Sequence, residues 1–297
     1  MKKVIDVSAN QGNINWSKVK GQVDGVIIRL GYRGYGKAGK FALDTKAMQN
    51  IKECRENGIP YGIYFFPTSI TFNEAVEEAE WIHSHIKDYK DELAFPIFLD
   101  SETAEAKNRS GRSDNLDKRT RTNLLNVIMR KLKELGYSYG VYASKSWFIE
   151  NLIPQDFPSD CHLWVAQYAS KCTYAGNKDG WQYTSSGMID GITGRVDMSQ
   201  WYVDFNSNAP TKPQNPYTEP TRLLYKRIPM QYGNDVKWLQ YELIRHGCLA
   251  EKNVKGKSNI DGWLGNDTHN AILRFQKQAN IDVDGKVGAI TRRELKK

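Results

Sequence analysis

The chain contains no apolar segment long enough to cross a membrane. Its uninterrupted apolar runs are only a few residues long, whereas a membrane-spanning helix needs roughly 18 or more apolar residues. Residues 1–3 lead directly into the segment 4–6 without the hydrophobic region of a secretory signal peptide. We therefore expect a soluble protein that is made in the cytoplasm without such a signal and does not insert into membranes.

Cysteine and histidine are also scarce. The four cysteines, Cys54, Cys161, Cys172 and Cys248, form no C-x-x-C pair and do not have the spacing of metal ligands, so we expect them to be reduced. The five histidines include no H-E-x-x-H sequence, which a typical zinc hydrolase would require. The sequence therefore predicts a mechanism that uses neither a metal nor another cofactor.

Residues 206–221 have almost no aliphatic side chains and hold four of the ten prolines. This composition predicts a semi-extended linker. It divides the chain into residues 1–205 and residues 222–297, which suit one large and one small domain. The second part has 15 Lys and Arg against 8 Asp and Glu, a balance of +7. Because the linker is neutral and the whole chain carries +8, the first part carries only +1.

Residues 1–205 alternate short apolar strands with amphipathic helices. Strands are expected at residues 4–7, 26–30, 61–66, 95–99, 139–142, 162–167, 181–184 and 195–198. Helices are expected after the capping-box pattern at Thr71, over residues 124–135 before Gly136, and near residues 145–152. About five strands have helical crossovers and three do not. This pattern predicts an α/β fold, an irregular (β/α)5(β)3 barrel, with its chemistry at the carboxyl ends of the strands.

Two carboxylates follow the strand expected at residues 95–99. Side chains two residues apart on a strand point to the same face, so Asp100 and Glu102 should have Cα atoms roughly 7 Å apart. Two acids this close cannot both ionise freely, so one of them should have a raised pKa and remain a proton donor near neutral pH. Such a pair suits cleavage of a glycosidic bond. Alternatively, the pair forms only a salt bridge or caps a turn.

Several ordered motifs support the enzymatic interpretation. They are VIDVS at residues 4–8, NQG at 10–12, INW at 14–16, GIPYGIYFF at 58–66, DSE at 100–102, LWVAQY at 163–168 and VDMS at 196–199. Together they resemble glycoside hydrolase family 25, the muramidases typical of phage endolysins and some bacterial autolysins, over essentially all of residues 1–205. Chitinase-like hydrolases also end a barrel strand in D-x-E, but their motif requires a further Asp where this chain has Phe98.

The resemblance implies cleavage of the β-1,4 bond between N-acetylmuramic acid and N-acetylglucosamine in peptidoglycan. Glu102 would be the general acid. Asp100 would stay ionised and orient the substrate 2-acetamido group, whose carbonyl could act as an internal nucleophile. Asp6 and Asp197 would position these groups and stabilise the positive charge that develops. These residues leave open whether the reaction retains or inverts the anomeric configuration.

Five further side chains at the predicted strand ends are candidates for contact with the sugar. They are Tyr64, Phe66, Tyr142, Trp164 and Gln182. Aromatic rings can stack on sugar faces, and the amide can bind hydroxyl groups. The alternative for each ring is a place in the core, which is the commoner fate of an aromatic residue in a strand.

An internal repeat marks the second part of the chain. The segment DGWLGNDT at residues 261–268 recurs as DGKVGAIT at residues 284–291. Glycine permits a positive φ, and the Asp and Thr side chains can bind backbone groups, so each copy predicts a turn that leads into a helix. We expect a small all-α domain of about three helices. With GNDVKWLQ at 233–240 and RFQ at 274–276, residues 232–296 resemble the peptidoglycan-binding domain type 1 modules.

The two resemblances together imply a phage-type endolysin that lyses its host cell. The charge of residues 222–297 fits attraction to an anionic Gram-positive wall, whereas no groove-reading motif supports nucleic acid as a partner. The enzyme would be made in the host cytoplasm and reach the wall after holin-type release. A bacterial autolysin of the same chemistry, a non-catalytic wall-binding protein and a peptidoglycan amidase or peptidase are the alternatives. The oligomeric state stays open.

Overall fold

The computed structural model describes residues 1–104, 110–204, 215–253 and 255–296. By its internal contacts the chain divides into two compact units, Met1–Lys212 and Pro213–Lys297, and each is treated by itself below. Among the described residues, no helix is both long and apolar enough to span a bilayer.

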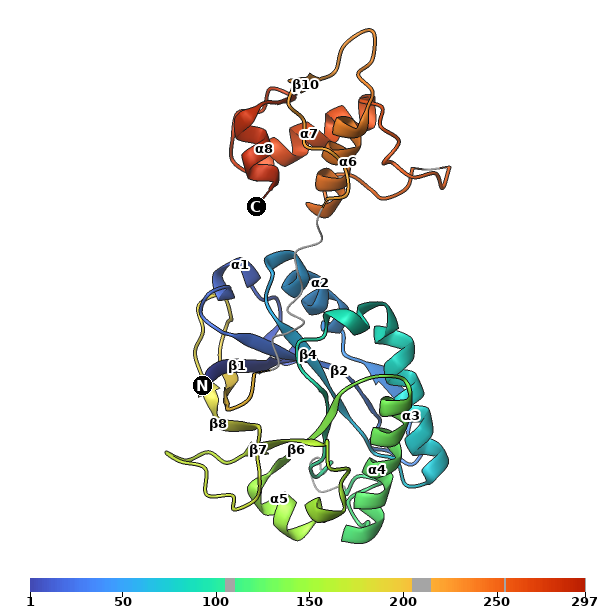
Figure 1. The fold of residues 1–297 in the computed structure, drawn as a ribbon, viewed down its shortest axis with the longest axis vertical. Helices are drawn as coiled ribbons and strands as arrows, with labels where there is room; N and C mark the ends of the chain where they lie inside the picture. The colour runs from blue at the N-terminus through green and yellow to red at the C-terminus, as the bar shows by residue number, and fades with distance from the viewer. Residues whose placement is uncertain (105–109, 205–214, 254, 297) are drawn as a thin grey trace. The chain divides into compact units, whose positions relative to one another are not determined.

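Eight strands of the first unit close into a barrel (Figure 1). They are β1 (Lys2–Val7), β2 (Gly25–Arg33), β4 (Tyr61–Phe66), β5 (Ile97–Asp100), β6 (Tyr139–Ser144), β7 (His162–Ala166), β8 (Gly180–Gly187) and β9 (Val196–Trp201). They pair in that order, and β9 pairs back with β1. All pairings are parallel except those of β9, which runs antiparallel to both neighbours. These are the eight strands that the sequence predicts, so the irregular α/β barrel is confirmed.

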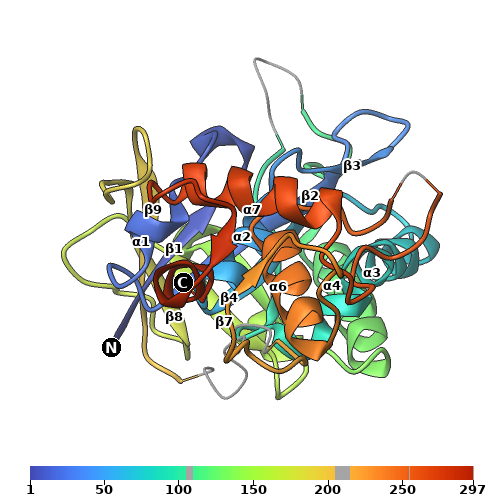
Figure 2. The ribbon, with the colours of Figure 1, turned by 90° about the horizontal axis from the view of Figure 1, so that it is seen from above.

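The helices of this unit cover the outside of the barrel and are concentrated in its first half. They are α1 (Trp16–Val19), α2 (Ala47–Asn57), α3 (Phe72–Ile86), α4 (Lys118–Glu134) and α5 (Lys145–Glu150), with short 3-10 turns at Ala9–Gln11, Lys87–Glu92 and Pro154–Asp156. Helices α3 and α4 pack side by side (Figure 1 and Figure 2). A strand that the sequence did not predict, β3 (Phe41–Leu43), pairs antiparallel with β2.

The core of the first unit has two layers because successive strand residues point to opposite faces of the sheet. The larger layer lies between the sheet and the helices and includes Ile5, Ile28 and Val141. The smaller layer fills the barrel itself with bulky side chains. It consists of Val4, Ile27, Ala94, Phe95, Phe98, Trp164 and Trp201, with Tyr64, Tyr142 and Val203 packed against it. The barrel is therefore a filled core, and a ligand can reach only its ends.

The second unit contains the three expected helices, α6 (Asn234–Arg245), α7 (Asn266–Gln278) and α8 (Ala289–Leu295). A two-stranded sheet, β10 (Leu224–Tyr225) with β11 (Lys286–Val287), adds to the all-α domain that the sequence predicts. The core of this unit is made of apolar residues from the helices and from both strands, among them Leu224, Leu239, Phe275 and Val287.

The start of the second unit includes residues that the sequence assigns to the linker. Of the expected linker 206–221, residues 206–214 lie outside the described part of the chain. Asn215 Nδ2 donates hydrogen bonds to the Trp238 carbonyl and to Glu242 Oε1, each at 2.9 Å. Tyr217 packs against the core of the unit. The proline-rich composition predicts a linker here, but these two residues pack onto α6. The exact limits 1–205 and 222–297 stay a prediction.

Candidate active site

The alternation of side chains in the strands places polar groups on top of the apolar barrel interior. Asp6 follows Val4 by two residues in β1, and Asp100 follows Phe98 by two in β5. Val4 and Phe98 belong to the interior layer, so both carboxylates face the same interior near the carboxyl ends of their strands. Asp197 is the register partner of Asp6, although it lies near the beginning of β9. The antiparallel direction of β9 brings its first residues to this end of the barrel.

Asp6 is held by a chain of hydrogen bonds from neighbouring strands. Gln182 Nε2 donates to Asp6 Oδ2 at 2.9 Å, and both side chains are buried. The Gln182 carbonyl oxygen in turn accepts from the hydroxyl groups of Tyr142 at 2.9 Å and Tyr168 at 3.1 Å. The two hydroxyl groups fix the orientation of the amide so that its NH2 group points to Asp6. The arrangement gives one carboxylate a rigid position at the mouth of the barrel.

All four predicted acids interact electrostatically at this end of the barrel. Burial and the charges of Asp197 and Glu102 raise the pKa of Asp6 well above its ordinary value. Burial and the charges of Glu102 and Asp6 do the same to the pKa of Asp100. The pKa of Asp197 is raised by burial. Because like charges at short range disfavour ionisation, each negative charge at this end of the barrel makes ionisation of the neighbouring acids less favourable.

The structure distinguishes Glu102 from Asp100 by access to solvent. Strand β5 ends at Asp100, which is buried, and Glu102 lies just beyond it and is exposed. The surrounding protein still displaces enough water to raise the pKa of Glu102, and the charge of Asp197 adds to this effect. The sequence predicts a raised pKa for one acid of the pair, whereas both are raised. Burial favours the neutral form of Asp100, and the expectation that Asp100 stays ionised remains a prediction.

The strand end that carries the two acids is fixed by hydrogen bonds to β6 and α5. The Ser101 N–H donates to the Tyr142 carbonyl at 2.8 Å. The Trp147 indole N–H donates to Ser101 Oγ at 3.0 Å. The Arg121 guanidinium lies over the Trp147 ring, 4.9 Å from its centroid. The backbone between Asp100 and Glu102 is therefore anchored from both sides.

The five predicted sugar contacts separate into two groups. Tyr64 and Tyr142 are half-buried and pack against the interior layer, and Gln182 is buried and binds Asp6. Trp164 is only 2% exposed and donates from its indole N–H to Ser199 Oγ at 3.0 Å. Trp164 therefore packs in the core and supports the Tyr142 ring, with centroids 4.5 Å apart. Its burial leaves little ring surface for a sugar, and the predicted contact with substrate stays a prediction.

Phe66 lies near the site but offers little surface to a ligand. Its side chain is 6% exposed, and its ring meets the ring of Tyr35 edge-on at a centroid distance of 5.3 Å. Tyr35 covers Phe66 and is itself 39% exposed. The more exposed aromatic surface at this place is therefore that of Tyr35, and the sugar contact expected of Phe66 stays a prediction.

The sequence reasoning missed several residues of this site. Arg29 projects from β2 and is the positive charge that lowers the pKa of Asp100 against the effect of burial. Its Nε donates to Asp44 Oδ2 at 2.7 Å, and the Asp44 side chain is fully buried. Asp44 also accepts from the Ala9 N–H at 3.0 Å, which ties the loop after β1 to the site. The sequence did contain a sign of this role, because Arg29 is the one charged residue within the apolar run of residues 25–30.

Tyr35 and Tyr168 were also missed. Tyr168 is 60% exposed although its hydroxyl group reaches Gln182. The charges of Asp100 and Glu102 add to burial in raising the pKa of Tyr35, so the two carboxylates lie near this ring. Two exposed rings thus border the acids, as a platform for a sugar chain requires. Both lie in loops after strands, where strand periodicity gives no signal.

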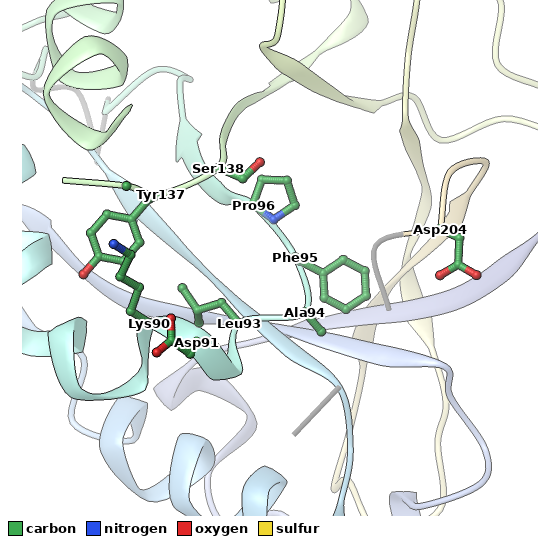
Figure 3. A pocket seen from close by; sticks show the side chains of 10 residues that line it. Lys90, Asp91, Leu93, Ala94, Phe95, Pro96, Tyr137, Ser138 and Asp204 are labelled. Carbon is green, nitrogen blue, oxygen red and sulfur yellow. The ribbon is translucent and has the colours of Figure 1, made fainter. Parts of the chain in front are cut away.

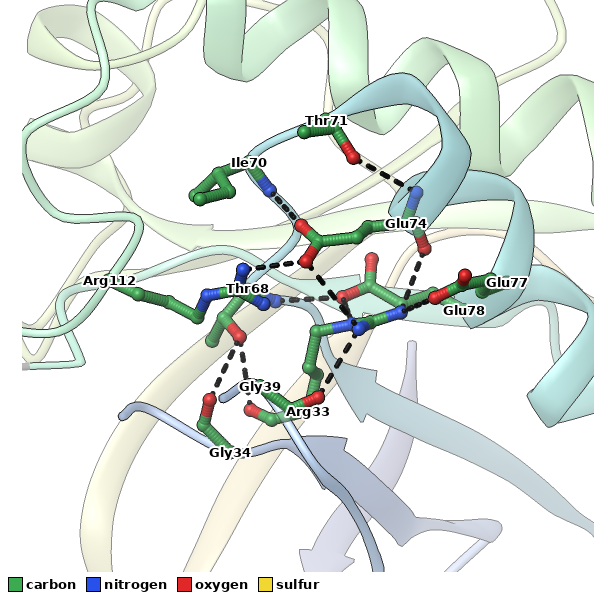
Figure 4. A network of polar contacts seen from close by, with 10 residues as sticks. All are labelled: Arg33, Gly34, Gly39, Thr68, Ile70, Thr71, Glu74, Glu77, Glu78 and Arg112. Atoms are coloured by element: carbon green, nitrogen blue, oxygen red, sulfur yellow. Dashed lines mark hydrogen bonds and ion pairs between the residues drawn. The ribbon is translucent and has the colours of Figure 1, made fainter. Parts of the chain in front are cut away.

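A buried polar network supports the loops beside Tyr35 and Glu102 (Figure 4). Arg33 at the end of β2 is 4% exposed and donates to Glu78 Oε1 at 3.0 Å and to Glu77 Oε2 at 2.8 Å. Arg112 donates to Glu74 Oε1 at 2.6 Å, and its backbone N–H donates to the Tyr35 carbonyl at 3.0 Å. The network connects the loop that follows Glu102 with helix α3 and with Tyr35.

Two hollows of the first unit have different relations to the acids. A small one next to Glu102 is lined also by Ser101, Ser69 and Arg121. A larger one, of about 330 Å³, lies at the opposite end of the barrel between Phe95, Tyr137 and Asp204 (Figure 3). The larger hollow is lined by the residues that precede β5 and β6, so it is separated from the carboxylates by the filled interior. Among the described residues, no three His, Cys, Asp or Glu side chains are grouped to hold a metal ion.

The comparisons with known proteins agree with this geometry. Residues 5–192 match the model of the Glycosyl hydrolases family 25, and residues 232–295 match that of the Putative peptidoglycan binding domain. The autolytic lysozyme of Clostridium acetobutylicum is 24% identical over 292 residues, which cover 97% of this chain and 77% of that protein. This relative therefore aligns with both units.

Solved structures share the fold of the first unit. The modular autolysin LytC from Streptococcus pneumoniae is 38% identical with a TM-score of 0.59, and the match covers 68% of this chain and 46% of that one. This chain thus corresponds to less than half of LytC. The catalytic domain of endolysin ply40 from bacteriophage P40 of Listeria monocytogenes is 26% identical with a TM-score of 0.55, over 71% of this chain and 98% of that one. The chain belongs to glycosyl hydrolases family 25, a family of glycoside-cleaving enzymes, and a putative peptidoglycan binding domain follows its barrel.

Proposed function

We propose that the chain is an N-acetylmuramidase that cleaves the β-1,4 bond between N-acetylmuramic acid and N-acetylglucosamine in peptidoglycan. The observation that carries the proposal is the group of four interacting carboxylates at the carboxyl end of the barrel, beside the exposed rings of Tyr35 and Tyr168. Acids with raised pKa values can donate a proton to a glycosidic oxygen near neutral pH. The match to a peptidoglycan binding domain supports the substrate.

Glu102 is the general acid in this proposal. It combines a raised pKa with exposure to solvent, so that a polysaccharide can reach its carboxyl group. Proton transfer to the leaving oxygen requires contact within hydrogen-bond distance, which the more buried acids offer less readily. Asp197, whose charge raises the pKa of Glu102, helps keep the proton on this group until the bond breaks.

Asp100 has a different role in this proposal. Its Oδ1 atom is buried and accepts no hydrogen bond from the described residues. A substrate 2-acetamido group whose N–H donates to the Asp100 carboxyl group would favour the ionised form of Asp100, which burial disfavours in the free protein. The oriented acetamido carbonyl could then attack the anomeric carbon. Asp6, fixed by Gln182, and Asp197 would stabilise the positive charge that develops on the sugar ring.

The proposal extends to the biological setting in which the enzyme acts. The likeness to a phage endolysin supports an enzyme made in an infected bacterium, released to the wall by a holin-type pore, and causing lysis. The balance of +7 in residues 222–297 suits an anionic Gram-positive wall. The likeness to an autolytic lysozyme over 97% of the chain favours a second candidate, a bacterial autolysin of the same chemistry. Production inside a Gram-positive host with and without a holin tests the first setting, which predicts lysis only with the holin.

Mass spectrometry of digested peptidoglycan tests the reaction. A muramidase produces fragments with N-acetylmuramic acid at the new reducing end. Reducing N-acetylglucosamine would instead indicate cleavage of the other glycosidic bond, and free stem peptides would indicate an amidase or peptidase. A wall preparation that remains undigested would favour a non-catalytic wall-binding protein. Each of these three results would refute the proposed reaction.

A further inference from the structure

The two copies of the repeat in the second unit build the same local structure. In the first copy, buried Gln240 of α6 donates to Asp261 Oδ1 at 2.8 Å and to the Trp263 carbonyl at 3.1 Å, and accepts from the Gly262 N–H at 2.8 Å. The turn requires glycine at residue 262, where φ is +81°. Each polar atom of the Gln240 amide is thereby used to fix the turn.

The second copy repeats these contacts one helix later. Buried Gln276 of α7 donates to Asp284 Oδ1 at 2.8 Å and to the Lys286 carbonyl at 2.9 Å, and accepts from the Gly285 N–H at 2.8 Å. The Asp, Gly and Thr residues of the repeat are thus explained by the fold, because they build the turns. Binding must therefore be sought in the residues at which the two copies differ.

Each copy borders a hollow, and the two hollows differ in their lining. The first-repeat hollow, of about 500 Å³, is lined mainly by polar side chains, among them Asn253, Asn259, Asp261 and Asp267, together with the indole of Trp263. The second-repeat hollow, of about 330 Å³, has Lys286, Ala289 and Ile290 at the places of Trp263, Asn266 and Asp267. The scaffold is shared, but only the first copy combines an aromatic ring with amide and carboxylate groups.

The aromatic group at the first-repeat hollow is large and exposed. Trp263 is 48% exposed and Tyr232 is 53% exposed. Their rings lie 4.4 Å apart between centroids at an angle of 38°, and the two residues pair as an antiparallel bridge. The backbone of Trp263 is fixed by Gln240, and the Leu264 N–H donates to the Gln231 carbonyl at 3.0 Å. The pair is therefore a rigid apolar surface beside a polar hollow, although burial of both rings would have been favourable.

We propose that the first-repeat hollow, lined by Trp263 with Tyr232 packed against that ring, is the site at which the second unit binds the glycan strand of peptidoglycan. The inference rests on the proposed action on peptidoglycan. Sugar rings present apolar faces that stack on aromatic side chains and hydroxyl groups that bond to amides and carboxylates. The carboxylates of Asp261 and Asp267 repel stem-peptide carboxylates and teichoic phosphates, so the hollow selects the uncharged sugar groups. The basic residues of the unit attract the anionic wall as a whole and do not form this site.

A binding experiment with the full chain tests the assignment. The chain carries Glu102→Gln so that the wall is not digested, and the probe is peptide-free glycan strands prepared from Gram-positive peptidoglycan. Trp263→Ala should weaken binding roughly tenfold, because central aromatic residues dominate the binding energy of such sites. Trp263→Phe should restore most of the affinity. Lys286→Gln, at the equivalent place of the second repeat, is the matched control and should change affinity less than about twofold.

The outcomes separate this inference from the proposed function. Trp263 is exposed, so its variants should have unchanged circular dichroism and melting temperature, which are measured alongside. Equal affinity of Trp263→Ala and the parent would overturn the inference. So would a competition experiment in which free stem peptides displace the probe and free glycan strands do not. Failure of the parent chain to bind glycan strands would also overturn it. Release of reducing sugars by the chain with Glu102 intact is measured on the same walls and tests the reaction independently of any of these results.

Discussion

Asp6 and Asp197 face each other as register partners across the antiparallel pairing of β1 and β9. Burial together with the negative charge of Asp197 raises the pKa of Asp6, because each disfavours its ionised form. The charge of Asp197 acts in the same direction on the pKa of Glu102. The charge of Asp197, on the one reversed strand of the barrel, thus contributes to the raised pKa of an acid on β1 and of an acid just beyond β5.

Replacement of Asp197 by Asn should shift the pH dependence of the reaction. Loss of its negative charge removes one cause of the raised pKa of Glu102, so Glu102 releases its proton at a lower pH. The alkaline limb of the profile of kcat/KM against pH should therefore move to lower pH. Asp190→Asn, which changes an exposed carboxylate between β8 and β9, should leave the limb in place. An unmoved limb in Asp197→Asn would contradict the electrostatic coupling.

The hydroxyl groups of Tyr142 and Tyr168 should differ in their importance. Both donate to Gln182, but Tyr142 is half-buried and Tyr168 is mostly exposed. Tyr142→Phe leaves the amide of Gln182 less firmly oriented toward Asp6 and should lower kcat about three- to tenfold. Tyr168→Phe should lower it less, because water can replace its hydroxyl group. Equal losses in both variants would show that burial of the Tyr142 bond is unimportant.

The strands and the acids could be predicted because they follow local rules. Most of the barrel strands coincide with short apolar runs in the sequence, whereas β8 and β9 also carry several polar residues. The D-x-E pattern at residues 100–102 places two acids at a strand end without knowledge of the rest of the fold. The place of Asp197 could not be predicted from strand periodicity, because only the antiparallel direction of β9 brings the beginning of that strand to the other carboxylates. Asp197 was included among the candidate acids because of the family resemblance.

How deeply each strand side chain is buried within the barrel could not be predicted from the sequence. Trp164 and Tyr142 are register partners on adjacent strands, yet Trp164 is buried and Tyr142 is only half-buried. The difference arises because the rings of Phe98 and Trp201 pack against Trp164. Closure of the sheet brings these three residues together. Tyr35, Asp44 and Tyr168 lie in loops, and their approach to the acids depends on that closure as well.

The stability of the first unit should fall as the pH rises toward 7, in part because of Glu78 (Figure 4). Burial raises the pKa of Glu78 from 4.5 to about 7, although its Oε1 accepts from Arg33 and from the Thr68 N–H. Between these pH values the folded chain holds a proton that the unfolded chain has released. The free energy of unfolding should therefore decrease over this range by roughly 1–3 kcal/mol and the contribution should be lost above it.

Urea denaturation at several pH values checks the contribution of Glu78. The free energy of unfolding of Glu78→Gln should depend less steeply on pH between about 5 and 7, because the amide does not titrate. The absolute stability of the variant is not the criterion, since Arg33 also loses a charged partner. Parallel curves for the parent and Glu78→Gln would rule out titration of this group in the range.

Binding of the full chain to intact walls should depend on salt. Residues 222–297 carry a balance of +7, and their attraction to an anionic wall is screened as ionic strength rises. Cosedimentation of the Glu102→Gln chain with Gram-positive walls should decrease between about 50 mM and about 500 mM NaCl. The remaining binding at high salt should be the part that Trp263→Ala removes. Salt-independent cosedimentation would contradict an electrostatic contribution.

The most direct test of the account is the rate at which Glu102→Gln releases reducing sugar ends from peptidoglycan. Glutamine preserves the size of the side chain but cannot donate the proton, so the rate should fall roughly 10²- to 10⁴-fold. Wall binding and the unfolding curve should be unchanged, and Glu150→Gln, at an exposed glutamate of α5, should be as active as the parent. A Glu102→Gln variant with a rate within a few fold of the parent would contradict the claim that this carboxyl group cleaves the bond.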